Sequence, residues 1–281
     1  MLRDTCPACN SQAAPAFTHA EFEIWRCHAC GSLFVHNVPE AEALNAIYAS
    51  ATYYELPAES VERIQQENQR RLQRLVRLGA RGRLLDVGCA RGAFLDAARR
   101  ENFETFGTEL SPENAALCQR NQHRVILGSA ADAAQFQIKF DVISCLDVIE
   151  HVPQPREFFS QLVNLLAPGG WLVISTPNYS GLIARILQQR DPFMIPPEHL
   201  NFFTAAGMRA LFEIAPVTEK RHENFGRLTA AERQRAVTKF FPRPLQKLSP
   251  LLEALLPPFF ANLNFLRQGL EQEFYLQRQR P

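Results

Sequence analysis

Four of the seven cysteines lie close together in the sequence, as two Cys-x-x-Cys pairs. Cys6 and Cys9 form the first pair, and Cys27 and Cys30 follow after 17 intervening residues. This spacing is typical of a site at which four thiolates hold one zinc ion. Four thiolates complete a tetrahedral shell and leave no position for a substrate, so the predicted zinc would be structural. A redox-active pair is the alternative, but redox Cys-x-x-Cys motifs occur singly, at a strand-to-helix junction.

The charge of the chain bears on what this predicted zinc module contacts. Small zinc modules often bind nucleic acid, which requires clustered basic side chains. Residues 1–38 contain few basic residues beside several acids, namely Arg3 and Arg26 beside Asp4, Glu21 and Glu23. The whole chain has 30 basic and 29 acidic residues, a net charge of +1, whereas proteins dominated by phosphate binding are distinctly basic. We therefore expect the module to face protein or substrate, and nucleic acid is disfavoured as a partner.

A second chemical group surrounds a glycine turn at residues 84–94. The apolar run before Gly88 predicts a buried strand, and the residues after Gly92 predict a helix. Gly88 permits the turn, and Gly92 permits close approach of a ligand. Asp86 precedes the turn, where a carboxylate would repel a pyrophosphate but suit an ammonium group. About 20 residues later, Glu109 ends the next predicted strand, where an acid accepts hydrogen bonds from ribose hydroxyls.

Two histidines lie where a general base would be useful. His151 follows the predicted strand 141–145, at the carboxyl edge where open α/β sheets bind ligands. A neutral imidazole there can take a proton from a hydroxyl group, and Glu150 is placed to orient it. His199 precedes a helix predicted to begin at Thr204 and is a second candidate for the active site. For both histidines, capping or packing is the alternative role.

Short β-branched runs alternate with helical patterns from residue 82 to residue 225. Such alternation predicts an α/β fold, with a mostly parallel sheet covered by helices on both faces. The expected helices are Ala93–Arg100, Pro112–Asn121, Arg156–Leu166 and Thr204–Ile214. The expected strands are Arg83–Val87, Thr105–Thr108, Arg124–Leu127, Asp141–Cys145, Trp171–Ser175, Val217–His222 and Glu273–Gln279.

These elements divide the chain into three parts. We expect a zinc ribbon at 1–38, a helical linker or cap at 39–80, and an α/β domain at 81–281 with a helical insertion at about 226–272. Leucines between 245 and 256 form an apolar stripe, which would pack on the sheet or lie against a membrane surface. No signal peptide and no run of 18 apolar residues occurs, so we expect a cytoplasmic protein.

These motifs resemble the class I S-adenosylmethionine-dependent methyltransferases over about half of the chain. The matching segments are the glycine turn Leu84–Phe94, the fourth-strand motif 140–152 and the turn 165–172. Glu150-His151 resembles the branch that holds the ubiquinone-pathway O-methyltransferases. The cysteine module with Tyr53-Tyr54 resembles the leader of bacterial methyltransferases that modify sugars or surface glycans. The sequence departs from the family at Ala90-Arg91, where glycine is common.

The resemblance implies a Rossmann-like sheet of seven strands, the last of them antiparallel, and S-adenosylmethionine as the cofactor. It also implies which residues bind that cofactor. From the methionine end to the adenine these are Asp86, Gly88, Cys89, Gly92, Leu146, Glu109, Leu110, Ser129 and Ala130.

The expected function is methyl transfer to a small molecule or a glycan, with His151, His199 and Glu150 as catalytic residues. Transfer to oxygen is favoured, and transfer to carbon of a keto-sugar is open. An RNA methyltransferase that uses the ribbon for RNA contact is one alternative. A non-catalytic protein that binds the cofactor is another.

Overall fold

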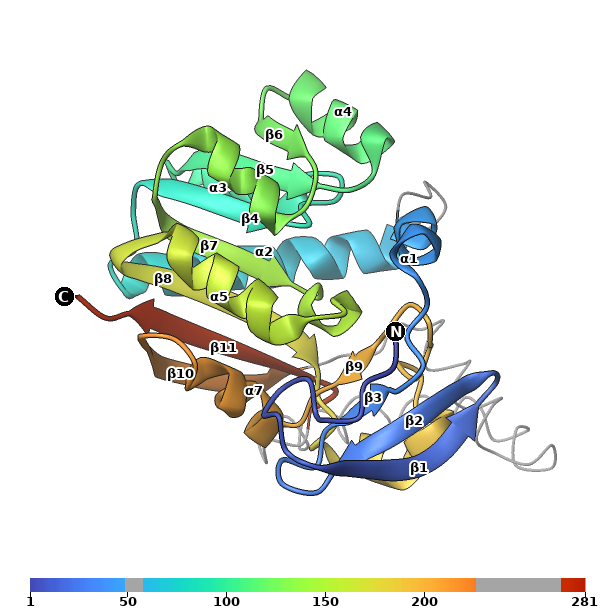
Figure 1. Ribbon diagram of the computed structural model, residues 1–281. Helices are drawn as coiled ribbons and strands as arrows, with labels where there is room; N and C mark the ends of the chain where they lie inside the picture. The colour runs from blue at the N-terminus through green and yellow to red at the C-terminus, as the bar shows by residue number, and fades with distance from the viewer. Residues whose placement is uncertain (49–57, 226–268, 281) are drawn as a thin grey trace, which may run out of the picture.

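A sheet of seven strands forms the larger part of the molecule (Figure 1). The computed structural model describes residues 1–48, 58–225 and 269–280. The strand order is β10-β11-β8-β7-β4-β5-β6, and β11 runs antiparallel to both of its neighbours. The prediction of a seven-stranded Rossmann-like sheet with an antiparallel last strand is therefore confirmed. The strands are β4 (Arg83–Val87), β5 (Glu104–Glu109), β6 (Arg124–Leu127), β7 (Phe140–Leu146), β8 (Leu166–Pro177), β10 (Val217–Phe225) and β11 (Glu271–Arg278).

Helices cover both faces of this sheet, with α5 and α7 on one side and α2 on the other (Figure 1). Thr204 caps α7, as predicted, because its hydroxyl accepts a hydrogen bond from the backbone N–H of Gly207 at 3.0 Å. The helices are α1 (Ala41–Tyr48), α2 (Ala58–Arg77), α3 (Ala93–Arg100), α4 (Pro112–Arg120), α5 (Pro155–Leu165), α6 (Leu182–Leu187) and α7 (Ala205–Phe212).

Alternation along the strands divides the core into two layers. Successive strand residues point to opposite faces, so neighbouring residues of one strand belong to different layers. Leu84 packs with Leu72 and Leu75 of α2, whereas Leu85 packs with Phe159 and Leu162 of α5. Apolar side chains on both faces explain why the strands read as continuous hydrophobic runs.

The cysteine module pairs with the larger part of the chain instead of standing apart. Its strands β1 (Ala13–His19), β2 (Phe22–Cys27) and β3 (Leu33–Val35) form a second sheet. The fourth strand of that sheet is β9 (Asn201–Phe202), which pairs antiparallel with β3. A hydrophobic cluster joins the same segments, since Ile24 and Val35 pack with Leu200 and Phe202.

Part of the predicted C-terminal region lies outside the described residues. This applies to the leucine stripe at 245–256, to most of the insertion expected at 226–272, and to Tyr53-Tyr54 of the linker. The last strand is described, as β11 (Glu271–Arg278), two residues from the predicted start at Glu273. Within the described ranges, none of the helices combines the length and the apolar character that crossing a membrane requires.

Candidate functional site

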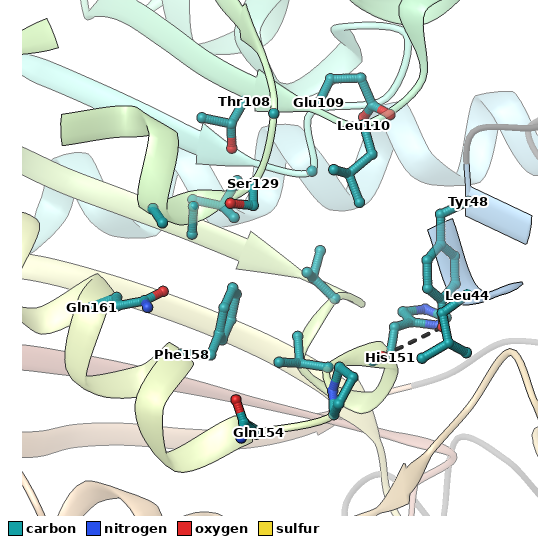
Figure 2. Close-up of a pocket in the computed structure, with 18 of the residues that line it drawn as sticks. Leu44, Tyr48, Thr108, Glu109, Leu110, Ser129, His151, Gln154, Phe158 and Gln161 are labelled. Carbon is teal, nitrogen blue, oxygen red and sulfur yellow. Dashed lines mark hydrogen bonds between the residues drawn. The ribbon is translucent and has the colours of Figure 1, made fainter. Parts of the chain in front are cut away.

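A cavity of about 480 Å³ opens at the carboxyl edge of β4, β5 and β7 (Figure 2). Parallel strands end together at this edge, so the loops that follow them converge on one place. Helices α1 and α5 supply the opposite wall, where Leu44 and Tyr48 lie beside His151. Of the predicted site residues, the cavity wall contains Gly88, Glu109, Leu110, Ser129, Ala130, Leu146 and His151.

The turn after β4 is tied to the end of β5 through Glu109. The backbone N–H of Ala90 donates to Glu109 Oε2 at 2.8 Å, and the N–H of Ser111 donates to Oε1 at 2.8 Å. Gly88 has a φ of 72°, and a Cβ there would lie 2.8 Å from Val148 Cγ2. Ala90 adopts a φ of 47°, so it holds the left-handed conformation at a position where the family has glycine. The turn therefore forms despite this departure, and it presents a fixed carboxylate to the cavity.

Three residues predicted for the cofactor lie behind this turn rather than on the cavity wall. Asp86 is buried, and its Oδ1 accepts a hydrogen bond from the Ser144 hydroxyl at 2.7 Å. Burial raises the pKa of Asp86 to about 7. A hydrogen bond with Cys118 and burial raise the pKa of the Cys89 thiol, so it is a protonated packing group near neutral pH. Gly92 is the N-cap of α3, and a Cβ there would lie 3.0 Å from Cys118 Sγ.

Two histidine rings meet at the far end of the cavity. Their centroids lie 4.8 Å apart, with His151 on the cavity wall and His199 behind it. His151 Nδ1 lies 2.7 Å from the carbonyl oxygen of Glu198, and His199 Nδ1 lies 2.8 Å from that of Phe193. Because a carbonyl can only accept, both Nδ1 atoms carry the proton in the neutral rings, and both Nε2 atoms are acceptors.

The surroundings keep both rings uncharged near neutral pH. Burial lowers the pKa of His151, and burial together with His151 lowers the pKa of His199 to about 3. Burial and the nearby Asp147 raise the pKa of the Glu150 carboxyl well above its usual value. Glu150, His151 and His199 offer ligand atoms within 4.8 Å of one another, so they could hold a divalent cation. Among the described residues, Glu150 Oε2 has no hydrogen-bond partner.

The low pKa of His199 predicts that the stability of the protein depends on pH. The unfolded chain binds a proton at this histidine below pH ~6.5, whereas the folded chain does not until about pH 3. Above pH ~6.5 His199 is neutral in both states and does not lower the free energy of unfolding. As the pH falls below ~6.5, protonation of His199 in the unfolded chain lowers the free energy of unfolding by about 1.4 kcal/mol per pH unit.

A variant at this position tests that expectation. His199→Asn keeps a donor for the Phe193 carbonyl but does not titrate. Between pH 7.5 and pH 5, the free energy of urea unfolding should fall by about 2 kcal/mol less in His199→Asn than in the wild type. His19→Asn, at the end of β1, is the histidine control and should fall like the wild type. An equal fall in His199→Asn and in the wild type would contradict the assignment.

The four predicted metal ligands converge at one end of the ribbon. Their sulfur atoms all lie within 4.8 Å of one another, and none of the four is in a disulfide. The Sγ atoms of Cys9 and Cys27 are 3.4 Å apart, and those of Cys6 and Cys30 are 3.7 Å apart. A tetrahedron with Zn–S bonds of ~2.3 Å has edges of about 3.8 Å, so the cluster fits a zinc ion. Asn10 and Gly31, which follow the two pairs, adopt positive φ, a conformation that both residue types tolerate.

Several cavity residues had no signal in the sequence. Leu44 and Tyr48 come from α1, and the Tyr48 hydroxyl donates to the Glu198 carbonyl at 2.8 Å. Phe158 of α5 lies on the same cavity (Figure 2). Asp147 also lines it, with a φ of 55° and a hydrogen bond from the Ser175 hydroxyl at 2.9 Å. Asp147 lies within the motif 140–152 noted in the sequence, but its left-handed conformation is visible only in the structure.

Comparison with known proteins is consistent with this geometry. A family model described as "Methyltransferase domain" matches residues 60–215, more than half of the chain. A ubiquinone biosynthesis O-methyltransferase of Leptothrix cholodnii is 30% identical over 105 residues, which are 34% of this chain and 44% of that protein. This match, like those to other relatives of the same description, spans less than half of the relative's own length.

A longer match and a solved structure agree with that family. The protein of the same description from Burkholderia thailandensis is 30% identical over 160 residues, 48% of this chain and 68% of its own length. The magnesium protoporphyrin IX methyltransferase of Synechocystis was solved with bound S-adenosylhomocysteine (SAH). It superposes on this chain with a TM-score of 0.56 at 15% identity. That superposition covers 85% of this chain and 100% of the other, and at this identity it bears on the fold alone.

Proposed function

Since the chain belongs to the methyltransferase-domain family, we propose that it transfers a methyl group from S-adenosylmethionine to an oxygen of a small-molecule acceptor. The observation that carries the proposal is the cavity, which has Glu109 beside the glycine turn at one end and His151 at the other. The cofactor supplies the reactive methyl group, and the protein must place the acceptor, remove its proton and exclude water.

The cofactor end of the cavity suits a nucleoside bearing an amino acid. Glu109 would accept hydrogen bonds from the ribose hydroxyls, because two backbone N–H groups already fix its carboxylate. The narrow space at Gly88 lets the main chain approach the methionine portion. Gly92, Cys89 and Asp86 would act through the backbone and through the shape of the turn. Leu110, Ser129, Ala130 and Leu146 would surround the adenine and the sulfur.

The acceptor end suits a hydroxyl group on an apolar body. Leu44, Tyr48 and Phe158 line it and would exclude water. His151 Nε2 would accept the proton of the hydroxyl, because the Glu198 carbonyl holds the proton of Nδ1. The neutral ring is available at pH 7 because burial lowers its pKa. The description of the relatives as O-methyltransferases also favours oxygen over carbon or nitrogen as the acceptor atom.

We further propose that one zinc ion is held by Cys6, Cys9, Cys27 and Cys30. Four cysteines at tetrahedral spacing, none of them in a disulfide, support this assignment. Cysteines that are not in disulfides are commonest in reducing compartments, which favours the cytoplasm.

The function is tested by measuring SAH formation from S-adenosylmethionine with three acceptor classes: quinols, sugar nucleotides and RNA. We expect turnover with a quinol acceptor, and a fall of about 10²- to 10⁴-fold in kcat for His151→Asn. His19→Asn is the control and should keep wild-type turnover. Turnover only with RNA or sugar nucleotides would overturn the acceptor class. Binding of SAH without turnover on any acceptor would favour a non-catalytic role. Full activity of His151→Asn, or turnover that depends on added Mg²⁺, would show that a group other than His151 removes the proton of the acceptor.

A further inference from the structure

We propose that Arg3 is a positioning residue for His151 and His199, so that the ribbon holds the acceptor end of the cavity in shape. This inference rests on the proposed function. The N-terminus lies beside β3 and β9 (Figure 1), and the Arg3 side chain reaches from the ribbon into the larger part of the chain. Arg3 does not line the cavity, so its effect would pass through the segments it binds.

The Arg3 guanidinium joins three separate segments through hydrogen bonds. Within the ribbon, Nε and Nη2 donate to the carbonyl of Val35 at 2.8 and 2.6 Å. Nη2 also donates to the carbonyl of Leu200 at 2.7 Å, and Nη1 donates to Asn201 Oδ1 at 2.8 Å and to the carbonyl of Pro153 at 3.4 Å. Leu200 follows His199, and Pro153 lies two residues after His151. The guanidinium therefore sits at the junction of both histidine-bearing segments.

These two segments are also bonded to each other at that junction. The backbone N–H of Leu200 donates to the carbonyl of Glu150 at 2.8 Å. The side-chain amide of Asn201 donates to the carbonyl of Val152 at 2.7 Å. Asn201 Oδ1 can keep this orientation because Arg3 Nη1 donates to it. Loss of the guanidinium would free the Asn201 amide to rotate and would remove its donors from the carbonyls of Val35, Leu200 and Pro153.

Arg3 is a buried charge that has no carboxylate among its hydrogen-bond partners in the described structure. The residue is 7% exposed, and each of its hydrogen bonds within the described structure ends on a neutral oxygen. Burial lowers the pKa of its guanidinium to about 9. A buried charge of this kind costs free energy, which the planar fork of donors offsets only if all of its acceptors stay in place. A lysine has one donor centre and cannot span the same three segments.

A variant pair tests this role in the full-length protein. Arg3→Met should lower kcat by about 10- to 100-fold through small displacements of the two rings. Zinc content and the dissociation constant for SAH should stay within about twofold of the wild type. Arg156→Met is the matched control, because Arg156 also links the ribbon to the larger part, through the carbonyl of Ala8 at 2.9 Å, but does not touch the histidine segments. It should keep wild-type kcat.

A second readout separates positioning from mere stability and does not need an acceptor. In ¹⁵N-histidine NMR spectra, the ring signals of His151 and His199 should shift in Arg3→Met and should not shift in Arg156→Met. Arg3→Lys should give intermediate shifts. Unchanged ring signals and unchanged kcat in Arg3→Met would overturn the proposal, and so would equal changes in Arg156→Met. Loss of zinc or of the fold in both Arg3 variants would also overturn it, since Arg3 would then serve folding alone. If the ring signals shift in Arg3→Met but the wild-type protein turns over none of the acceptors, the positioning role of Arg3 is supported and the proposed function is contradicted.

Discussion

Replacing Cys6 by serine is expected to remove the metal and to unfold the ribbon. Cys6 is fully buried, and its Sγ lies 3.7 Å from that of Cys30. A serine hydroxyl is a poor zinc ligand near neutral pH, so only three thiolates would remain to coordinate a zinc ion that requires four ligands. Metal binding supplies about 10–16 kcal/mol of folding free energy in zinc-finger peptides, and a module of 38 residues has little core to replace it.

Two measurements check this result. Zinc measured by mass spectrometry should fall from about one ion per chain to none. The midpoint of thermal unfolding should fall by about 10 °C or more, since 1 kcal/mol shifts it by ~2–4 °C in a protein of this size. Cys145→Ala is the control, because Cys145 is equally buried but lies in β7. It should keep the zinc, and a Cys6→Ser protein with full zinc and an unchanged midpoint would refute the metal site.

The damage should extend beyond the ribbon, because the ribbon shares a sheet with β9. The Thr204 hydroxyl donates to the carbonyl of Cys30 at 2.7 Å, and β3 pairs with β9 two residues after His199. Loss of the metal would loosen this junction first. We therefore expect acceptor turnover to be lost in Cys6→Ser while binding of SAH, at the opposite end of the cavity, is retained.

The strands and helices around the glycine turn were predictable because their signals are local. The predicted bounds of β4, β6 and α3 match the structure, since each element is a short apolar or helical run closed by a glycine or a polar residue. β8 begins at Leu166, five residues before the predicted start at Trp171. The prediction placed the start too late because a Pro-Gly-Gly run normally indicates a turn. Pairing with β7 extends the strand across that run, and no local pattern encodes such pairing.

The end of the cavity at His151 was predicted only in part, because chain segments far apart in sequence build it. His151 followed from its place after a strand, but β9 is two residues long and has no periodicity of its own. Arg3 is one of few basic residues in 1–38, and nothing local indicates that its partners are Leu200 and Asn201. Tyr48 lies in a linker whose return to the sheet depends on tertiary packing. Contacts of this kind become visible only when the fold is known.

The largest effect at the cofactor end is expected from Glu109→Gln. The carboxylate accepts two backbone N–H donors and would accept ribose hydroxyls with its remaining lone pairs. A glutamine has one acceptor oxygen, so its amide nitrogen would face either the Ala90 N–H or the Ser111 N–H. Hydrogen bonds to charged groups are worth about 1.5–3 kcal/mol each, and the turn would lose one of its ties as well. We expect a loss of about 2–4 kcal/mol in binding, which is roughly 30- to 1,000-fold in Kd.

Calorimetric titration with SAH measures this loss directly. Glu113→Gln removes the same charge from the exposed first turn of α4, four residues away, and should bind SAH like the wild type. This control separates the specific role of Glu109 from the general effect of one fewer negative charge near the cavity. Circular dichroism and zinc content should be unchanged in both variants, because the backbone groups that Glu109 binds lie in the loops after β4 and β5, away from the ribbon. A folded Glu109→Gln protein that binds SAH within threefold of the wild type would place the cofactor elsewhere, and the role assigned to His151 would then lose its basis.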